Sequence, residues 1–167
     1  LLVAKTGLRF SEALALTPDD FDFSKQSISV EKTWDYKSSK GGMQETKNKS
    51  SNRKVIMDWQ VAMQFSQMIR ELDLEKPIFV KGRIYNSMVN NRLGALCIKA
   101  DIPIISVHGL RHTHASLLLF AGVSIASVAK RLGHSSMITT QETYLHIIKE
   151  LDNQDNDKII RHLSTLS

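Results

Sequence analysis

The sequence predicts a mainly helical domain that also contains a small antiparallel β-sheet, an α+β fold. Apolar residues recur at helical spacing through most of the second half of the chain. One β-branched, alternating stretch at 28–33 indicates a strand, and 54–57 offers a returning partner. The 167 residues, 42% of them hydrophobic, are enough for one domain with a real core.

Two short helices are expected before the first strand. Gly7 predicts the end of one, and Ser11 the start of the next. Pro18 and the acidic run over 19–22 end that second helix, and we interpret the run as a solvated turn. The polar stretch 35–52 is predicted to be the long tip of a hairpin.

Helices are predicted over most of the remaining chain, from apolar periodicity, capping residues and glycines. They are expected after Asp58, over 86–100, over 108–121, between the cap Ser124 and Gly133, and from about Thr139 onwards. The acidic stretch 152–157 is interpreted as a linker, and an amphipathic segment follows it. We therefore divide the chain into a main domain, 1–150, and a C-terminal part, 151–167.

Basic residues outnumber acidic ones, with 22 Lys and Arg against 17 Asp and Glu and a formal net charge of +5. Such a balance permits an anionic partner, nucleic acid first. Basic side chains are concentrated in one stretch rich in Ser and Gly, at Lys37, Lys40, Lys47, Lys49, Arg53 and Lys54. On charge alone, this stretch is interpreted equally well as a DNA contact or as a solvated loop.

Other features of the sequence indicate the cellular compartment in which the protein is expected to act. The sequence has no run of about 18 apolar residues, so no membrane span is predicted, and its first residues do not resemble a signal peptide. Cys97 is the only cysteine, which excludes an internal disulfide and favours a small buried residue in a cytoplasmic protein. The chain does not begin with Met, so we expect it to be part of a longer protein.

Several separated motifs carry residues suited to phosphate chemistry. Cleaving a phosphodiester without a metal ion requires a side-chain nucleophile, cations for the non-bridging oxygens and a proton donor for the leaving 5′ oxygen. The relevant motifs are Thr6-Gly7-Leu8-Arg9, His108-Gly109-Leu110-Arg111, Leu132-Gly133-His134 and, further on, Tyr144. His108 and Arg111 are three positions apart, so they share one helical face.

In this order, the motifs resemble those of the catalytic domain of the tyrosine recombinases, also called phage integrases. The resemblance covers nearly the whole chain. It implies that Tyr144 is the nucleophile and that Arg9 and Arg111 clamp the scissile phosphate. It further implies that His134 donates a hydrogen bond to this phosphate and that His108 is a base or an additional phosphate ligand.

The resemblance also implies a catalytic lysine on a β-hairpin, which would protonate the leaving 5′ oxygen. The family's hairpin pattern, Thr-Lys-Thr-x-x-Ser-x-Arg, matches the stretch from Thr46 to Arg53 imperfectly. Lys47 is the preferred candidate on alignment. Lys49 is a rival, because Asn48 stands where the pattern has its second threonine.

The reaction that the resemblance implies is the breaking and rejoining of DNA strands by a catalytic domain at 1–150. Because a free tyrosine has a pKa near 10, Tyr144 needs cations or a base to react. The implied product is a covalent 3′-phosphotyrosine, formed without metal, ATP or other cofactor. The implied partners are double-stranded DNA and, in the full-length protein, further copies in a homotetramer. The motifs look most like those of integrases from phages or integrative elements.

Plainer interpretations stay open for individual residues. Glu12 either buttresses Arg9 or is an exposed carboxylate at a helix start. His112 and His114 are interpreted as structural, with His114 bonding a buried backbone group. A zinc site made by both of them with His108 would lack further ligands. For the whole chain, the alternatives are a DNA-binding module that does not cut and a metal-dependent nuclease.

Overall fold

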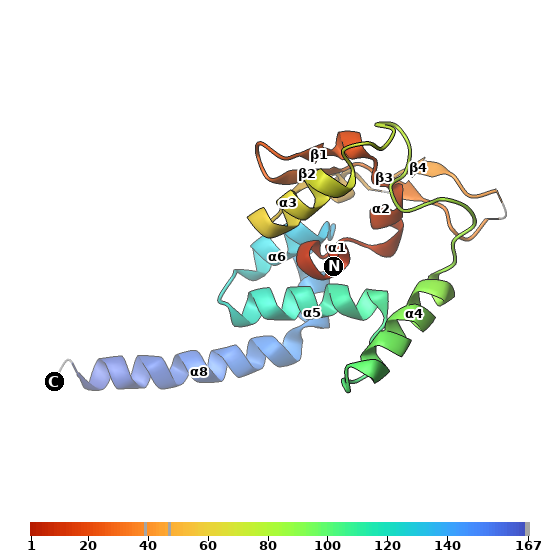
Figure 1. Cartoon of the computed structure of the whole chain (residues 1–167). Helices are drawn as coiled ribbons and strands as arrows, with labels where there is room; N and C mark the ends of the chain where they lie inside the picture. Colours follow the sequence, from red (N-terminus) through yellow and green to blue (C-terminus); the bar gives the residue numbers. More distant parts are fainter. Residues whose placement is uncertain (39, 47, 166–167) are drawn as a thin grey trace.

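The computed structural model describes residues 1–38, 40–46 and 48–165, and it shows a mainly helical domain with a small antiparallel sheet, as predicted (Figure 1). The α-helices are α1 Leu2–Thr6, α2 Phe10–Ala15, α3 Trp59–Met68, α4 Asn86–Lys99, α5 Val107–Phe120, α6 Ile125–Leu132, α7 Met137–Thr143 and α8 Leu145–Ser164. Short 3-10 helices cover Pro18–Asp20 and Lys49–Ser51. The strands are β1 Phe21–Asp22, β2 Ser27–Val30, β3 Lys32–Trp34, β4 Met43–Glu45 and β5 Arg53–Ile56.

Strand β2 lies at the centre of a three-stranded antiparallel sheet, between β1 and β5. Ile28 on β2 pairs with Val55 on β5, and both are buried, which confirms the predicted returning strand. The predicted strand 28–33 is divided, because the chain leaves this sheet after Val30 and forms β3, which pairs with β4. The predicted hairpin tip therefore contains a strand of its own, whose residues are all exposed.

The acidic run after Pro18 is more ordered than the solvated turn that the sequence predicts. The Asp20 carboxylate accepts hydrogen bonds from the backbone N–H and the hydroxyl of Thr17, at 2.8 and 3.0 Å. It also binds Lys32 Nζ at 2.9 Å. The Asp20 side chain is only 10% exposed, and a buried carboxylate needs such partners. The turn is therefore joined to β3.

Most of the predicted helix ends are confirmed. Gly7 and Gly133 end α1 and α6 in the left-handed conformation, with φ of 70° and 69°, which glycine adopts without steric cost. Asp58 and Ser124 accept hydrogen bonds from backbone N–H groups at the starts of α3 and α6. Helix α2 has Arg9 as its N-cap, so it begins slightly earlier than predicted.

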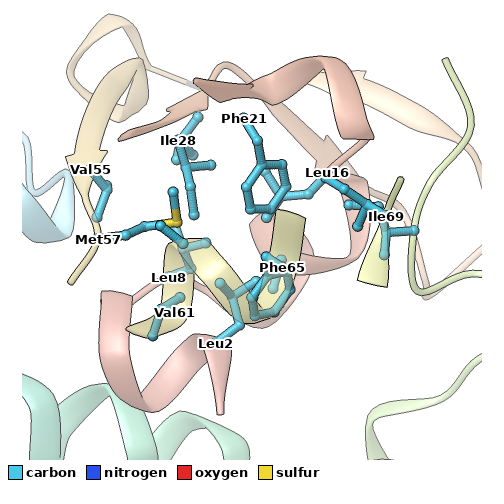
Figure 2. Close-up of a cluster of buried hydrophobic side chains, with 14 residues drawn as sticks. Leu2, Leu8, Leu16, Phe21, Ile28, Val55, Met57, Val61, Phe65 and Ile69 are labelled. Atoms are coloured by element: carbon cyan, nitrogen blue, oxygen red, sulfur yellow. The ribbon is translucent and has the colours of Figure 1, made fainter. Parts of the chain in front are cut away.

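Two hydrophobic clusters hold these elements together. The first packs α1, α2 and α3 against the three-stranded sheet, around Leu8, Ile28 and Phe65 (Figure 2). The second lies among α5, α6 and the start of α8, and its buried members are Ala115, Leu119, Val128, Leu132, Tyr144 and Ile147. Contacts between α1 and α5 connect the two halves. Tyr144 is thus packed into a core.

Helix α8 runs without a break from Leu145 to Ser164, so the stretch 152–157 is helical and not the linker that the sequence predicts. That stretch is rich in Asp and Asn but contains neither Gly nor Pro, so no strong helix breaker interrupts it. The helix projects away from the rest of the domain (Figure 1). The division of the chain at residue 150 stays a prediction. Within the described ranges, no helix combines the length and the apolar character that crossing a membrane requires.

Candidate active site

Arg9 and Arg111, the two predicted phosphate ligands, meet at the C-terminal end of α6. Arg111 Nη2 donates to the carbonyl oxygen of Leu132 at 2.8 Å, and Arg9 Nη1 donates to the same oxygen at 3.5 Å. Arg9 Nη2 also donates to the carbonyl of Gly133 at 3.1 Å. His134 follows directly in the sequence. The structure thus brings together three predicted site residues that come from distant parts of the chain.

The end of α6 suits this role because the last carbonyl groups of a helix have no partner within it. Their partial negative charge also favours cations. A Cβ atom at Gly133 would lie only 2.8 Å from Arg53 Nη1, so this glycine is needed for space as well as for its positive φ. The turn after α6 is therefore shaped to receive guanidinium groups.

Arg111 is 3% exposed, and backbone carbonyls satisfy its guanidinium. Besides its bond to Leu132, Nη1 donates to the carbonyl of Gly7 at 2.5 Å, which joins α5 to the loop that carries Arg9. Burial, and then the positive charge of Arg9, lowers the pKa of Arg111 to about 10. Arg111 therefore still carries its charge at neutral pH.

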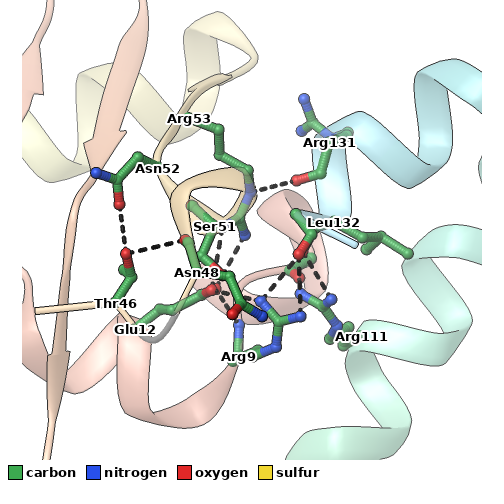
Figure 3. A network of polar contacts seen from close by, with 12 residues as sticks. Arg9, Glu12, Thr46, Asn48, Ser51, Asn52, Arg53, Arg111, Arg131 and Leu132 are labelled. Carbon is green, nitrogen blue, oxygen red and sulfur yellow. Dashed lines mark hydrogen bonds and ion pairs between the residues drawn. The ribbon is translucent and has the colours of Figure 1, made fainter. Parts of the chain in front are cut away.

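Glu12 connects Arg9 to a third arginine, Arg53 (Figure 3). Its carboxylate accepts from Arg9 Nη1 at 2.8 Å, and from Arg53 Nη1 and Nη2 at 3.0 and 2.9 Å. Burial raises the pKa of Glu12, but the bonds and charges of the two arginines outweigh this and lower the pKa below its ordinary value. Glu12 is 1% exposed, so the alternative of an exposed carboxylate is wrong. It buttresses Arg9.

Arg53 and Arg131 extend this network and were not among the predicted site residues. Arg53 Nε donates to the backbone carbonyl of Arg131 at 2.6 Å. Arg131 Nη2 in turn donates to the carbonyls of Lys5 and Ile56. These bonds tie β5 and α1 to α6. Arg53 could have been found from the sequence, because it is the last residue of the hairpin pattern.

His114 has the structural role that the sequence predicts. Its Nδ1 lies 3.0 Å from the carbonyl oxygen of Ala4, and its Nε2 accepts from Arg131 Nε at 2.9 Å. Because an arginine nitrogen can only donate, the proton of the neutral ring is on Nδ1. Burial, and then the charge of Arg131, lowers the pKa of His114 to about 4. Both ring nitrogens are therefore occupied, which argues against the zinc interpretation. Within the described part of the chain, no three His, Cys, Asp or Glu side chains form a group that could hold a metal ion.

His134 is held by α7. Its Nδ1 lies 2.7 Å from the hydroxyl of Thr140, a fully buried residue. Burial, followed by the positive charges of Arg111, Arg9 and Arg53, lowers the pKa of His134 to about 4. The ring is therefore neutral at pH 7 and lies in the field of the same arginines.

Tyr144 stands where α7 ends and α8 begins, and it is 3% exposed. Its hydroxyl lies 2.9 Å from Nδ1 of His112, the residue after Arg111 on α5. Burial raises the pKa of Tyr144, and the positive charge of Arg111 offsets part of this effect. The contact between His112 and the predicted nucleophile was not foreseen, because His112 was interpreted as structural.

The two remaining predicted site residues differ in how they are placed. His108 is exposed and packs edge-to-face against His112, with ring centroids 4.5 Å apart. Lys47 lies outside the described residues. Its rival Lys49 begins the 3-10 helix between β4 and β5.

Comparison with known proteins agrees with this geometry. The model of the phage integrase family matches residues 1–150. The chain is 28% identical over 173 residues to the integrase of Staphylococcus phage L54a, which covers 93% of this chain and 49% of that protein. It is 26% identical over 169 residues to the ICEBs1 integrase of Bacillus subtilis, with coverage of 92% and 45%. The chain therefore belongs to the phage integrase family, and it spans about half the length of these relatives.

Solved structures show the same fold. XerA recombinase superimposes with a TM-score of 0.69 at 28% identity, over 92% of this chain and 55% of that one. The Tn1549 transposon integrase, solved in complex with transposon right end DNA, gives a TM-score of 0.74 at 24% identity, over 86% and 52%. The fold is that of a tyrosine recombinase catalytic domain, which confirms both the predicted fold and the predicted family.

Proposed function

We propose that this domain breaks and rejoins DNA strands in site-specific recombination, with Tyr144 as its nucleophile. The observation that carries the proposal is the meeting of Arg9, Arg111 and His134 at the end of α6. The charge of Arg111 also acts on the Tyr144 phenol. Membership of the phage integrase family supports the same activity.

In the proposed reaction, Tyr144 Oη bonds to the scissile phosphorus while the bond from phosphorus to the 5′ oxygen breaks. Arg9 and Arg111 stabilise the charge on the non-bridging oxygens, because a guanidinium donates two hydrogen bonds in a fixed planar geometry. Their donors now face main-chain carbonyls, and a bound phosphate would compete for them. The product is a 3′-phosphotyrosine, which retains the bond energy for rejoining, so the cycle needs no ATP.

Three further groups complete the proposed machinery. His134 is neutral, and if Nδ1 accepts from Thr140, then Nε2–H is left to donate to the phosphate. Lys47 is the proposed proton donor to the leaving 5′ oxygen, with Lys49 as the alternative. His108 is proposed as a further phosphate ligand or base, as the family resemblance implies.

The proposed substrate is double-stranded DNA, and the proposed assembly is a homotetramer of the full-length protein on that DNA. The Tn1549 integrase structure contains transposon DNA, and relatives include integrases of a phage and of an integrative element. These relatives support a role in the movement of such an element.

A suicide DNA substrate, which loses a short 5′ fragment on cleavage, tests the proposal. The chain should form an adduct with the DNA that survives denaturation. Tyr144→Phe should abolish this adduct while the affinity for DNA stays the same, because only one hydroxyl is removed. Tyr85→Phe is the matched control, since this partly exposed tyrosine on the loop before α4 has no proposed role.

Two other results would contradict the proposal. Binding without any adduct from the unaltered chain would favour a DNA-binding module. Cleavage that EDTA abolishes, with free DNA ends in place of protein-linked ones, would favour a metal-dependent nuclease.

A further inference from the structure

His112 occupies a position that the proposed reaction does not yet use. It lies one residue after Arg111 on α5, and its Nδ1 is 2.9 Å from the Tyr144 hydroxyl. The two rings are tilted by 58° with centroids 5.8 Å apart. The contact joins α5 to the start of α8, and it involves the oxygen atom that would attack phosphorus.

The attack of a phenol requires that its proton go elsewhere. As the bond from Oη to phosphorus forms, the phenolic proton must pass to an acceptor that lies within hydrogen-bond distance. Among the contacts of the described residues, the ring of His112 is the hydrogen-bond partner of this hydroxyl. His108, the base that the family resemblance suggests, instead packs against the His112 ring.

We propose that His112 is a catalytic residue of this domain, and that its Nδ1 accepts the phenolic proton of Tyr144 during cleavage. The proposal rests on the function proposed above. In this step the bond from Tyr144 Oη to phosphorus forms, the bond to the 5′ oxygen breaks, and His112 becomes an imidazolium. The separate donor on the hairpin protonates the 5′ oxygen. On rejoining, the imidazolium returns its proton to the phenol.

The surroundings of His112 suit a base that must be neutral before the reaction. Burial, and then the charges of His108 and Arg111, lowers the pKa of His112 below its ordinary value. His112 and Tyr144 line a shallow surface hollow between α5 and the start of α8. The other titratable groups near His112 are His134, which follows α6, and His146 of α8, which lines this hollow too. Among the side chains that the structure describes, no carboxylate contributes to the electrostatics of His112, so no described group favours the protonated ring.

The first experiment measures the single-turnover rate of adduct formation. In His112→Asn, the amide replaces the hydrogen bond to Tyr144 but cannot take the proton. We expect the rate at pH 7 to fall by about 10²–10⁴-fold, the usual contribution of a general base, with DNA affinity unchanged. His146→Asn is the control, because this exposed histidine touches the hollow but not the hydroxyl. An unchanged or faster rate in His112→Asn would overturn the proposal, and a faster rate would mean that the bond restrains the tyrosine.

A modified leaving group distinguishes the protonation of the 5′ oxygen from the deprotonation of the Tyr144 phenol. A substrate with sulfur in place of the bridging 5′ oxygen needs no proton on its leaving group. This substrate should restore the cleavage rate of the lysine variant that lacks the general acid, either Lys47→Ala or Lys49→Ala. It should not restore the cleavage rate of His112→Asn. The pH profile adds a second readout. The acid limb of the unaltered chain should be lost in His112→Asn, whose rate should rise steadily with pH as the phenol ionises.

A DNA-free measurement keeps the proposal testable if the variants fold poorly. Nitrogen-15 NMR of the unaltered chain reports which ring nitrogen of His112 carries the proton, with His112→Asn used to assign the signal. The proposal requires a neutral ring with its proton on Nε2. A proton on Nδ1 would make His112 a donor to Tyr144 and would overturn it. If Tyr144→Phe still forms adducts, the proposed function itself fails, whereas a normal adduct rate in His112→Asn refutes only the role of His112.

Discussion

Arg111 shows how a charged side chain can be buried and still be available for chemistry. Its guanidinium is satisfied by the carbonyls of Gly7 and Leu132, neither of which carries a full charge. The phosphodiester group of DNA, which carries a full negative charge, would offer a stronger partner than either carbonyl. The side chain is therefore preorganised, with its charge retained and its direction fixed before DNA arrives.

We expect Arg9→Ala and Arg111→Ala each to slow cleavage by about 10²–10³-fold, the usual effect of losing one transition-state donor. The rate of adduct formation on the suicide substrate measures this. Arg83→Ala provides the control, since Arg83 stacks on Tyr85 away from the network. A tenfold or smaller loss for both Arg9 and Arg111 would argue against a two-arginine clamp.

At this scale, the sequence motifs indicated which residues meet but not how they are held. The spacing of Arg9 and Glu12 correctly suggested a contact. The partner of His112 could not be predicted, because the contact depends on how α8 packs against α5. The acceptors of both arginines are backbone carbonyls, which leave no signature in the sequence.

At the scale of elements, the buried pair of Glu12 and Arg53 joins α2 to the first residue of β5. Arg53 also reaches the carbonyl of Arg131 on α6. The segment of the chain between β4 and β5, to which the candidate lysines belong in the sequence, leads directly into β5. The position of the start of β5 is therefore coupled to the orientation of Arg9 through one carboxylate.

Breaking this pair should be costly. Glu12→Gln should destabilise the fold by about 3–5 kcal/mol, because the buried Arg53 loses the carboxylate that compensates its charge. Arg53→Ala should also destabilise it, but less, because Glu12 keeps its ion pair with Arg9. The two effects should be strongly non-additive in a double-mutant cycle measured by urea unfolding. Asp73→Asn, which removes the exposed pair with Lys76, should leave the unfolding midpoint unchanged. Simple additivity of Glu12→Gln and Arg53→Ala would count against the coupling.

The same pair predicts a pH dependence. Because the pKa of Glu12 is lowered in the folded protein, its ionised form contributes stability above the ordinary pKa, and this contribution is lost as the pH falls through the folded value. Stability should therefore decline below about pH 4.5, and Glu12→Gln should show a shallower decline.

Elements with local signals were the easiest to predict. The glycine and serine at the ends of α6 fix that helix almost to the residue. In contrast, β4 and the middle of α8 were missed. Strand β4 is exposed on all its residues, so no alternation marks it. The middle of α8 has the composition of a linker, and helix continuity there depends on the absence of breakers.

For the molecule as a whole, excess positive charge should make DNA binding strongly dependent on salt. The exposed Lys37, Lys40 and Lys54 lie in or beside the hairpin, and each phosphate contact releases counterions. The logarithm of the association constant for duplex DNA should fall linearly with the logarithm of the salt concentration. The double change Lys37→Ala and Lys40→Ala should make the slope shallower.

The control for this measurement is Lys25→Ala, because Lys25 is already paired with Asp22. A salt response that is flat in the unaltered chain would contradict the role of the hairpin as a DNA contact. An equal change of slope in Lys25→Ala would mean that only total charge matters, not its position.

The carbonyls at the end of α6 also determine which amino-acid substitutions the domain can tolerate during evolution. Every amino acid has a backbone carbonyl, so the aim of Arg9 and Arg111 does not depend on which side chain stands at position 132. Apolar replacements that fill the same core volume can accumulate there without redirecting either arginine. Position 133 lacks this freedom, because its φ of 69° and the nearby Arg53 both require glycine. Mutational tolerance should therefore differ sharply between two adjacent residues that serve the same pair of arginines.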